Sequence, residues 1–184
     1  MPANAQLRSD AVLNRGRILD TAREQIAAQG PDVSMGDIAR AAGVAVGTLY
    51  RHFPKKADLV VAILELHVST IADSLERASG EIAEGASAAA VLRQFMESAV
   101  DSHAEGRILK QAARSLGVYS TSSEAFTRMN DAVRAILEQG AQAGELSAGI
   151  EPSDIYLLMS TLPDDQPTAV RKRWVELILP GLLR

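Results

Sequence analysis

Two short helical stretches joined at a glycine constrain the fold of this chain more than any other feature. Ser34 is a good N-cap for the first stretch, and Asp37 three residues later gives a weak version of the capping box. Gly43 can end this stretch because glycine adopts the positive φ of a tight turn without strain. Residues 46–52 form the second stretch. The pattern predicts a helix-turn-helix over about residues 34–53.

The remainder of the chain is also predicted to be helical. Helical periodicity recurs, strand-like alternation is missing, and aromatic residues make up only 4% of the composition. A long helix is expected from Pro54 to about Ser79, and a small-residue hinge follows it over residues 80–87. Pro180 is expected to kink the last helix or end it early. A first helix is predicted to end at Gly30 and Pro31, with Ile18, Ala22 and Ile26 on its apolar face. Further helices are predicted around residues 92–103, 107–116, 126–140, 155–162 and 170–182. The clearest apolar stripe is expected on the helix over 126–140, at Phe126, Met129, Val133, Ile136, Leu137 and Gly140. The expected fold class is all-α.

Composition and charge limit the kinds of protein that this chain can be. It has 184 residues, enough to bury a core, and no cysteine, which excludes disulfides and thiolate metal sites. No signal peptide or membrane-spanning run is visible, so a soluble cytoplasmic protein is expected. Residues 1–58 carry eight Lys and Arg against six Asp and Glu, a net of +2 within a total of −4. A weakly basic head on an acidic body suits a protein that contacts phosphates at one end.

The second short stretch offers groups suited to DNA. Packing of the two stretches leaves one face of the second free to enter a major groove, which is about 12 Å wide. Gly47 allows a close backbone approach, and the hydroxyls of Thr48 and Tyr50 can donate to phosphate oxygens. Two lysines lie at the start of the next helix, where the helix dipole favours an anion. The predicted DNA contacts are Ser34, Val46, Gly47, Thr48, Tyr50, His52, Lys55 and Lys56.

The order of residues in this region resembles the TetR family of bacterial repressors. The resemblance rests on Ile38-Ala39-x-x-Ala42-Gly43-Val44-x-x-Gly47-Thr48-Leu49-Tyr50-x-His52-Phe53-x-x-Lys56-x-x-Leu59 and covers about a third of the chain. It implies three N-terminal helices for DNA, a connecting fourth helix, and a helical C-terminal domain that dimerises and binds a small effector. It also implies that Thr48, Tyr50 and Lys56 contact phosphates. Two residues depart from the pattern: Ala45 replaces the usual helix cap, and Gly36 weakens the first stretch.

This organisation leads to specific expectations for the rest of the chain. The expected divisions are an N-terminal tail over 1–8, a DNA-binding domain over 9–54, a connecting helix over 55–79 and a ligand-binding and dimerisation domain over 80–184. A mostly apolar effector is expected in a pocket lined by His67, Phe95, Met96, His103, Tyr119, Phe126, Met129 and Met159. A homodimer is expected through Tyr156, Trp174, Leu177, Ile178 and Leu182. Double-stranded operator DNA is the other expected partner, and neither a cofactor nor a membrane is expected.

Other classes of protein have weaker support in the sequence. Asp101, Ser102 and His103 are the residue types of a catalytic triad, but neighbours on a helix point about 100° apart and cannot form a proton relay. Glu97 and Asp101 with His103 are compatible with a metal, although none is predicted. The chain is therefore not expected to be an enzyme. Two alternatives stay open: a DNA-binding regulator without a small-molecule ligand, and a helical ligand-binding protein that no longer uses DNA.

Overall fold

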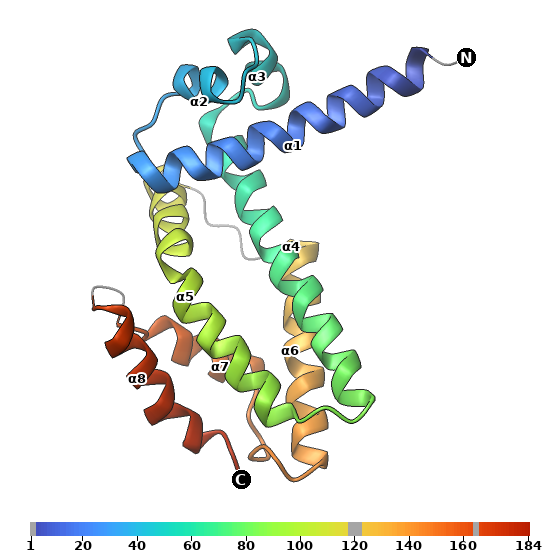
Figure 1. Ribbon diagram of the computed structural model, residues 1–184, viewed down its shortest axis with the longest axis vertical. Coiled ribbons are helices and arrows are strands. Elements are labelled where there is room, and N and C mark those ends of the chain that lie inside the picture. Colours follow the sequence, from blue (N-terminus) through green and yellow to red (C-terminus); the bar gives the residue numbers. More distant parts are fainter. Residues whose placement is uncertain (1–2, 118–122, 164–165) are drawn as a thin grey trace. The chain divides into compact units, whose positions relative to one another are not determined.

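The computed structural model describes residues 3–117, 123–163 and 166–184, and it describes side chains for residues 13–100, 111–117, 123–163 and 166–184. Within these residues the fold is all-helical, as predicted, apart from an isolated antiparallel bridge between Leu146 and Leu183. The helices are shown in Figure 1. They are α1 (Ala3–Gln29), α2 (Met35–Ala41), α3 (Val46–His52), α4 (Lys56–Ala83), α5 (Ala88–Ser115), α6 (Glu124–Gln142), α7 (Pro152–Ser160), α8 (Thr168–Ile178) and the 3₁₀ turn η1 (Leu179–Gly181).

Several helix ends differ from the sequence expectation. Helix α1 begins at Ala3, where a tail through residue 8 was expected, and α4 begins at Lys56 and continues to Ala83. Helix α5 runs without interruption through Gly106, where two separate helices were expected. A single glycine costs a helix only about 1 kcal/mol, which packing elsewhere along the same helix readily offsets. The expectation for Pro180 is confirmed, because α8 ends at Ile178 and the chain tightens into η1.

The chain forms two compact units whose limits differ from the expected divisions. Unit 1 comprises residues 1–66 and 105–120, and unit 2 comprises residues 67–104 and 121–184. The C-terminal part of α5 belongs to unit 1, where Ala112 and Ala113 are buried in the core. Local sequence patterns do not show this return of the chain, because it depends on contacts between residues far apart in sequence.

The core of unit 1 positions the predicted helix-turn-helix. The periodic residues Ile18, Ala22 and Ile26 of α1 are fully buried, which confirms the apolar face predicted for this helix. They pack in one cluster with residues of α2, α3 and the first part of α4. Figure 1 shows α2 and α3 side by side, with α1 passing below them. The unit therefore has the three-helix arrangement expected of a helix-turn-helix domain.

Unit 2 has its own core, in which α6 is the central element. The predicted stripe of α6 is buried from Met129 to Gly140. Gly140 allows a close approach, since a Cβ atom there would lie 2.9 Å from the Cβ of Ala88 and nearer still to the side chain of Leu146. The loop that follows α6 also contacts the start of α5. There the Glu145 carboxylate accepts a hydrogen bond from the Ala89 N–H at 3.0 Å. This backbone hydrogen bond is the main cause that lowers the pKa of Glu145.

None of the helices in the described part of the chain combines the length and apolar composition that a membrane crossing requires.

Candidate nucleic-acid interface

Helix α2 begins at the predicted cap. Ser34 has extended backbone geometry, and its Oγ accepts a hydrogen bond from the Asp37 N–H at 3.1 Å. The same hydroxyl donates to Asp37 Oδ2 at 2.6 Å, and this bond is the main cause that lowers the pKa of Asp37. Asp37 also pairs with Arg40 at 2.8 Å on the surface. Ser34 is therefore confirmed as a cap, while its contact with DNA stays a prediction.

The turn between α2 and α3 follows the predicted geometry. Gly43 has φ of +64°, a conformation that side chains with a Cβ atom rarely adopt. The Gly43 N–H donates to the Arg40 carbonyl and the Val44 N–H donates to the Ala39 carbonyl, so the last turn of α2 is closed by backbone hydrogen bonds. This turn sets the direction in which α3 leaves α2.

Helix α3 is attached to unit 1 through one fully buried side chain, Leu49. Its N-cap residue is Ala45, which supplies no side-chain hydrogen bond, so the missing cap expected from the sequence is confirmed. Because successive helical residues rotate by about 100°, the face opposite Leu49 points away from the core. On the exposed side, Val46 is 46% and Tyr50 is 47% exposed.

The other residues of α3 differ in their exposure. Gly47 is exposed, whereas Thr48 and His52 are half-buried. Sequence reasoning missed Arg51, which is exposed and follows Gly47 by one helical turn. Its position opposite Leu49 could have been identified from the helical period, since a cation on that face is suited to phosphates or guanine edges.

The two adjacent lysines before and at the start of α4 have different surroundings. Lys55 is exposed, and its backbone N–H donates to the Asp58 carboxylate at 2.9 Å. Lys56 is half-buried, and its ammonium donates to the Val33 carbonyl at 2.6 Å and to the Pro31 carbonyl. Both acceptors belong to the segment between α1 and α2. The Lys56 ammonium is thus directed at the protein backbone, which the sequence expectation of a phosphate contact did not anticipate.

Two arginines of α1 extend to the helix-turn-helix. The Arg17 guanidinium donates to the carbonyl of Ala42, the C-cap residue of α2, at 2.8 Å. The Arg15 guanidinium carbon lies 5.3 Å from the centre of the Phe53 ring, in the range of a cation–π contact. A cation at the C-terminal end of a helix is favoured by the helix dipole. Helix α1 therefore places one arginine at the C-terminal end of α2 and another at the C-terminal end of α3.

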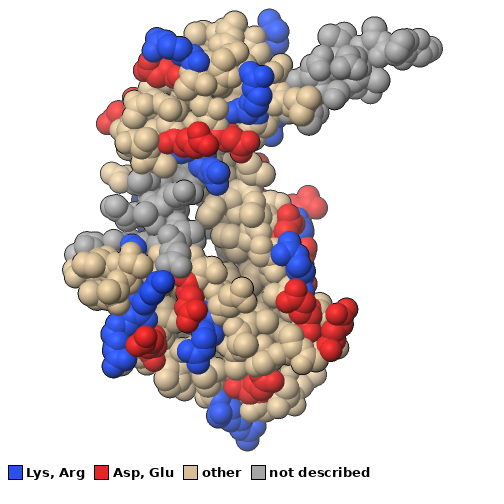
Figure 2. Space-filling model, in the orientation of Figure 1, with Lys and Arg blue, Asp and Glu red and all other residues tan. Residues whose placement is uncertain are grey.

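The charge distribution on the surface is mixed. On the face shown in Figure 2, Lys and Arg side chains lie beside Asp and Glu side chains in small groups. Most of the described surface on this face belongs to residues without charge. A face of this kind does not supply a strong general attraction for a polyanion. On this face, affinity for DNA would have to come from local contacts, such as hydroxyls, backbone N–H groups and a few lysines and arginines.

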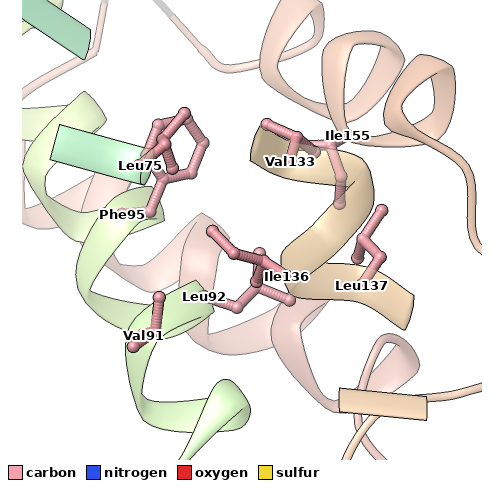
Figure 3. Close-up of a pocket in the computed structure, with 8 residues that line it drawn as sticks. All are labelled: Leu75, Val91, Leu92, Phe95, Val133, Ile136, Leu137 and Ile155. Carbon is pink, nitrogen blue, oxygen red and sulfur yellow. The ribbon is translucent and has the colours of Figure 1, made fainter. Parts of the chain in front are cut away.

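Few of the residues predicted to line a ligand pocket line the cavity of unit 2. The cavity is apolar and has a volume of about 10 Å³, room for about one water molecule. Figure 3 shows side chains of α4 and α5 on one side of it and of α6 and α7 on the other. Of the predicted set only Phe95 lines it, together with Leu75, Val91, Leu92, Val133, Ile136, Leu137 and Ile155.

The other predicted pocket residues lie elsewhere. Met96 and Met129 are buried in the core of unit 2, and Phe126 and Met159 pack against that core half-buried. Phe126 contacts the Tyr156 ring, with ring centres 5.8 Å apart. His67 is half-buried on α4. The side chain of His103 and all of Tyr119 lie outside the described residues.

The residues predicted for a dimer interface divide into three groups by exposure. Leu177 is 64% exposed, whereas Tyr156, Trp174 and Ile178 are half-buried, and burial raises the pKa of the Tyr156 phenol. Leu182 is a correction, because it is 7% exposed and packs in the core of its own unit. The turn at η1 redirects the chain, so that the helical period no longer places Leu182 on the face of Leu177.

Two further exposed apolar residues of α7 and α8 are not among the residues predicted for the interface. Val170 lies on α8 seven residues before Leu177 and is 45% exposed, and Leu157 on α7 is 64% exposed. Val170, Trp174 and Leu177 follow the i, i+4, i+7 spacing of one helix face, and Val175 on the other side is buried. The outer face of α8 is thus an apolar stripe.

A helix-turn-helix with an uncovered second helix, followed by a helical second unit, defines a class of DNA-binding regulators. Comparison with known proteins identifies the family. Residues 18–63 match the model described as "Bacterial regulatory proteins, tetR family". Residues 87–184 match the model described as "Transcriptional regulator SbtR-like, C-terminal domain".

Individual relatives agree with these matches. The HTH-type transcriptional regulator SAR0097 of Staphylococcus aureus (strain MRSA252) is 46% identical over 72 residues, which span 38% of this chain and 37% of that protein. A TetR transcription regulatory protein from Mycobacterium vanbaalenii has a crystal structure with a TM-score of 0.76 and 34% identity, covering 97% of this chain and 99% of that one. The TetR transcriptional regulator SCO0520 from Streptomyces coelicolor gives a TM-score of 0.69 and 26% identity, covering 92% of this chain and 98% of that one.

The chain therefore belongs to the TetR family of helix-turn-helix transcriptional regulators. Membership of this family makes it a regulator and not an enzyme, as expected from the sequence.

Proposed function

We propose that the protein represses transcription by binding a palindromic operator with the exposed face of α3, and that a small, mostly apolar effector releases it. The observation that carries the DNA-binding part is that the buried anchors of α3 are Leu49 and its C-cap residue Phe53, which leaves Val46 and Tyr50 uncovered. A helix held in this way can enter a major groove without losing its packing. Such a regulator would work in the cytoplasm, where chromosomal operators lie.

The side chains of this interface would divide into two roles. Hydroxyls of Thr48 and Tyr50 and the ring of His52 would donate to phosphate oxygens, with Lys55 and Arg51 adding charge. The Ser34 hydroxyl donates to Asp37 in the free protein and would have to leave that carboxylate to donate to a phosphate. Val46 and Gly47 carry no polar side chain, and their place on the outer part of α3 suits contact with base edges. A valine methyl favours the thymine methyl in the major groove. We therefore expect an A·T or T·A pair at the base that faces Val46.

These roles are separable by two substitutions on α3. Tyr50→Phe removes one neutral hydroxyl, and we expect binding about fivefold to tenfold weaker on operator and non-operator duplexes alike. Val46→Ala, the matched variant, is expected to reduce the preference for the operator over a duplex changed at one base pair, with little effect on non-operator DNA. Fluorescence anisotropy titrations with both duplexes test this. A Tyr50→Phe variant that loses affinity only for the operator would contradict the phosphate assignment.

The proposed dimer depends on the outer face of α8. An apolar stripe with two large exposed side chains is unusual on a monomer surface and fits association with a second copy. Two copies related by a twofold axis would present two α3 helices to half-sites about one helical turn apart, which requires a palindromic operator. We propose that α7 and α8 of each subunit form this interface, with Trp174 and Leu177 near its centre.

The effector is supported only by the apolar composition of unit 2. Ligand pockets in proteins usually have several hundred Å³, whereas the cavity between α5, α6 and α7 has about 10 Å³. An effector would therefore have to open this core, and it would release DNA only if it preferred the opened state. The small cavity favours a second candidate, a DNA-binding regulator without a ligand. Apolar compounds that raise the melting temperature would support the effector, and their consistent failure would support the second candidate.

A further inference from the structure

Helix α2 is held at both ends by cations from other helices. Before its first residue, the Lys56 ammonium of α4 binds the carbonyl oxygens of Val33, at 2.6 Å, and Pro31. After its last residue, the Arg17 guanidinium of α1 binds the Ala42 carbonyl at 2.8 Å. These contacts join residues 23 to 25 positions apart in sequence, so they connect separate elements of unit 1.

We infer that Lys56 is a positioning residue: its ammonium fixes the segment that leads into α2, and the exposed Lys55 supplies the phosphate contact in its place. This inference rests on the proposed DNA-binding function. The acceptors of Lys56 are carbonyls of turn residues outside the helices, which need donors from elsewhere. Lys56 is half-buried around these acceptors, whereas Lys55 has its side chain in solvent.

The orientation of α3 depends on these hydrogen bonds at the ends of α2, because α3 has few stabilising contacts of its own. Its N-cap, Ala45, provides no side-chain hydrogen bond, and Leu49 is its one buried residue. The direction of α3 is therefore set by α2 and by the turn at Gly43. A shift at the start of α2 would be transmitted to α3, and a misplaced α3 would lose contacts with DNA while the protein stays folded.

Adjacent lysines allow a matched comparison. Lys56→Gln and Lys55→Gln each remove one charge, and both variants are titrated with a duplex that the wild-type protein selects from a random library. Titrations run across about 50–200 mM salt, at a low temperature at which circular dichroism shows each variant folded. Lys56→Arg, which keeps a charged donor, is the conservative variant and guards against a loss of folding in Lys56→Gln.

The expected results differ for the two positions. Lys56→Gln weakens binding about tenfold with an unchanged slope of log affinity against log salt, and Lys56→Arg restores most of the affinity. Lys55→Gln flattens the slope by about one unit, since one phosphate contact is lost. Flattening by about one unit in Lys56→Gln would overturn the inference in favour of a direct contact. Unchanged affinity with a lower melting temperature would overturn it in favour of a purely stabilising role. Wild-type protein that binds no DNA would overturn the proposed function as well.

Discussion

Leu49→Ala is expected to lower the free energy of unfolding of unit 1 by about 2–5 kcal/mol and to abolish operator binding. Leu49 is fully buried, and it is the only buried one among the seven residues of α3. Removing three carbon atoms there loses the burial of the side chain and leaves a cavity among α1, α2 and α4 residues. Helix α3 is too short to persist without that packing. Urea unfolding followed by circular dichroism, with DNA titration of the same samples, measures both effects.

Tyr50→Ala is the matched control for this prediction. Tyr50 follows Leu49 directly but is 47% exposed, so its truncation should leave the urea midpoint nearly unchanged while it weakens DNA binding. Comparing Leu49→Ala with Tyr50→Ala therefore distinguishes the loss of packing that holds α3 in place from the loss of a contact with DNA. An unchanged urea midpoint in Leu49→Ala would show that α3 does not depend on this side chain, which would contradict the structural basis of the proposed interface.

Leu177→Asp is expected to convert the proposed dimer into monomers over the micromolar range. Leu177 is 64% exposed on the apolar stripe of α8, and a carboxylate placed in an apolar interface loses its hydration without gaining a partner. Substitution of a central interface residue commonly costs about 2–4 kcal/mol, which corresponds to an increase of at least about thirtyfold in the dimer dissociation constant. Sedimentation equilibrium at several concentrations measures this constant directly.

The control for Leu177→Asp carries the same charge on another helix. Ala90 is exposed in the first turn of α5, where a carboxylate is favoured by the helix dipole, so Ala90→Asp should stay dimeric and fully folded. A wild-type protein that sediments as a monomer would contradict the dimer proposal outright. If Leu177→Asp stayed as dimeric as Ala90→Asp, the interface would have to lie on another surface than the outer face of α8.

Local signals in the sequence were sufficient for the helix-turn-helix. Ser34 caps α2, Gly43 takes the positive φ, and Ala45 leaves α3 without a side-chain cap, as the residue types alone indicated. Each of these features depends on the chemistry of one residue and its neighbours within a turn of helix. Helical periodicity likewise identified the buried faces of α1 and α6.

Features that depend on contacts between residues far apart in the sequence could not be predicted from local patterns. The hydrogen bonds of the Lys56 ammonium go to two carbonyls more than twenty residues away, and nothing near Lys56 in the sequence indicates them. The burial of Leu182 follows from the change of direction at η1. Of the residues predicted for an effector pocket, only Phe95 lines the small cavity of unit 2. The sequence could not indicate this because apolar residues suit a core and a ligand site equally well, and only packing distinguishes the two uses.

The proposal that α3 reads a palindromic operator is tested most directly by selecting bound fragments from genomic DNA with the purified protein. We expect enrichment of sites with two inverted half-sites about one helical turn apart, and we expect the Val46→Ala variant to enrich them less strongly over other sequences. Equal recovery of all genomic sequences, or the same enrichment with Val46→Ala as with the wild-type protein, would contradict sequence-specific reading by the exposed face of α3.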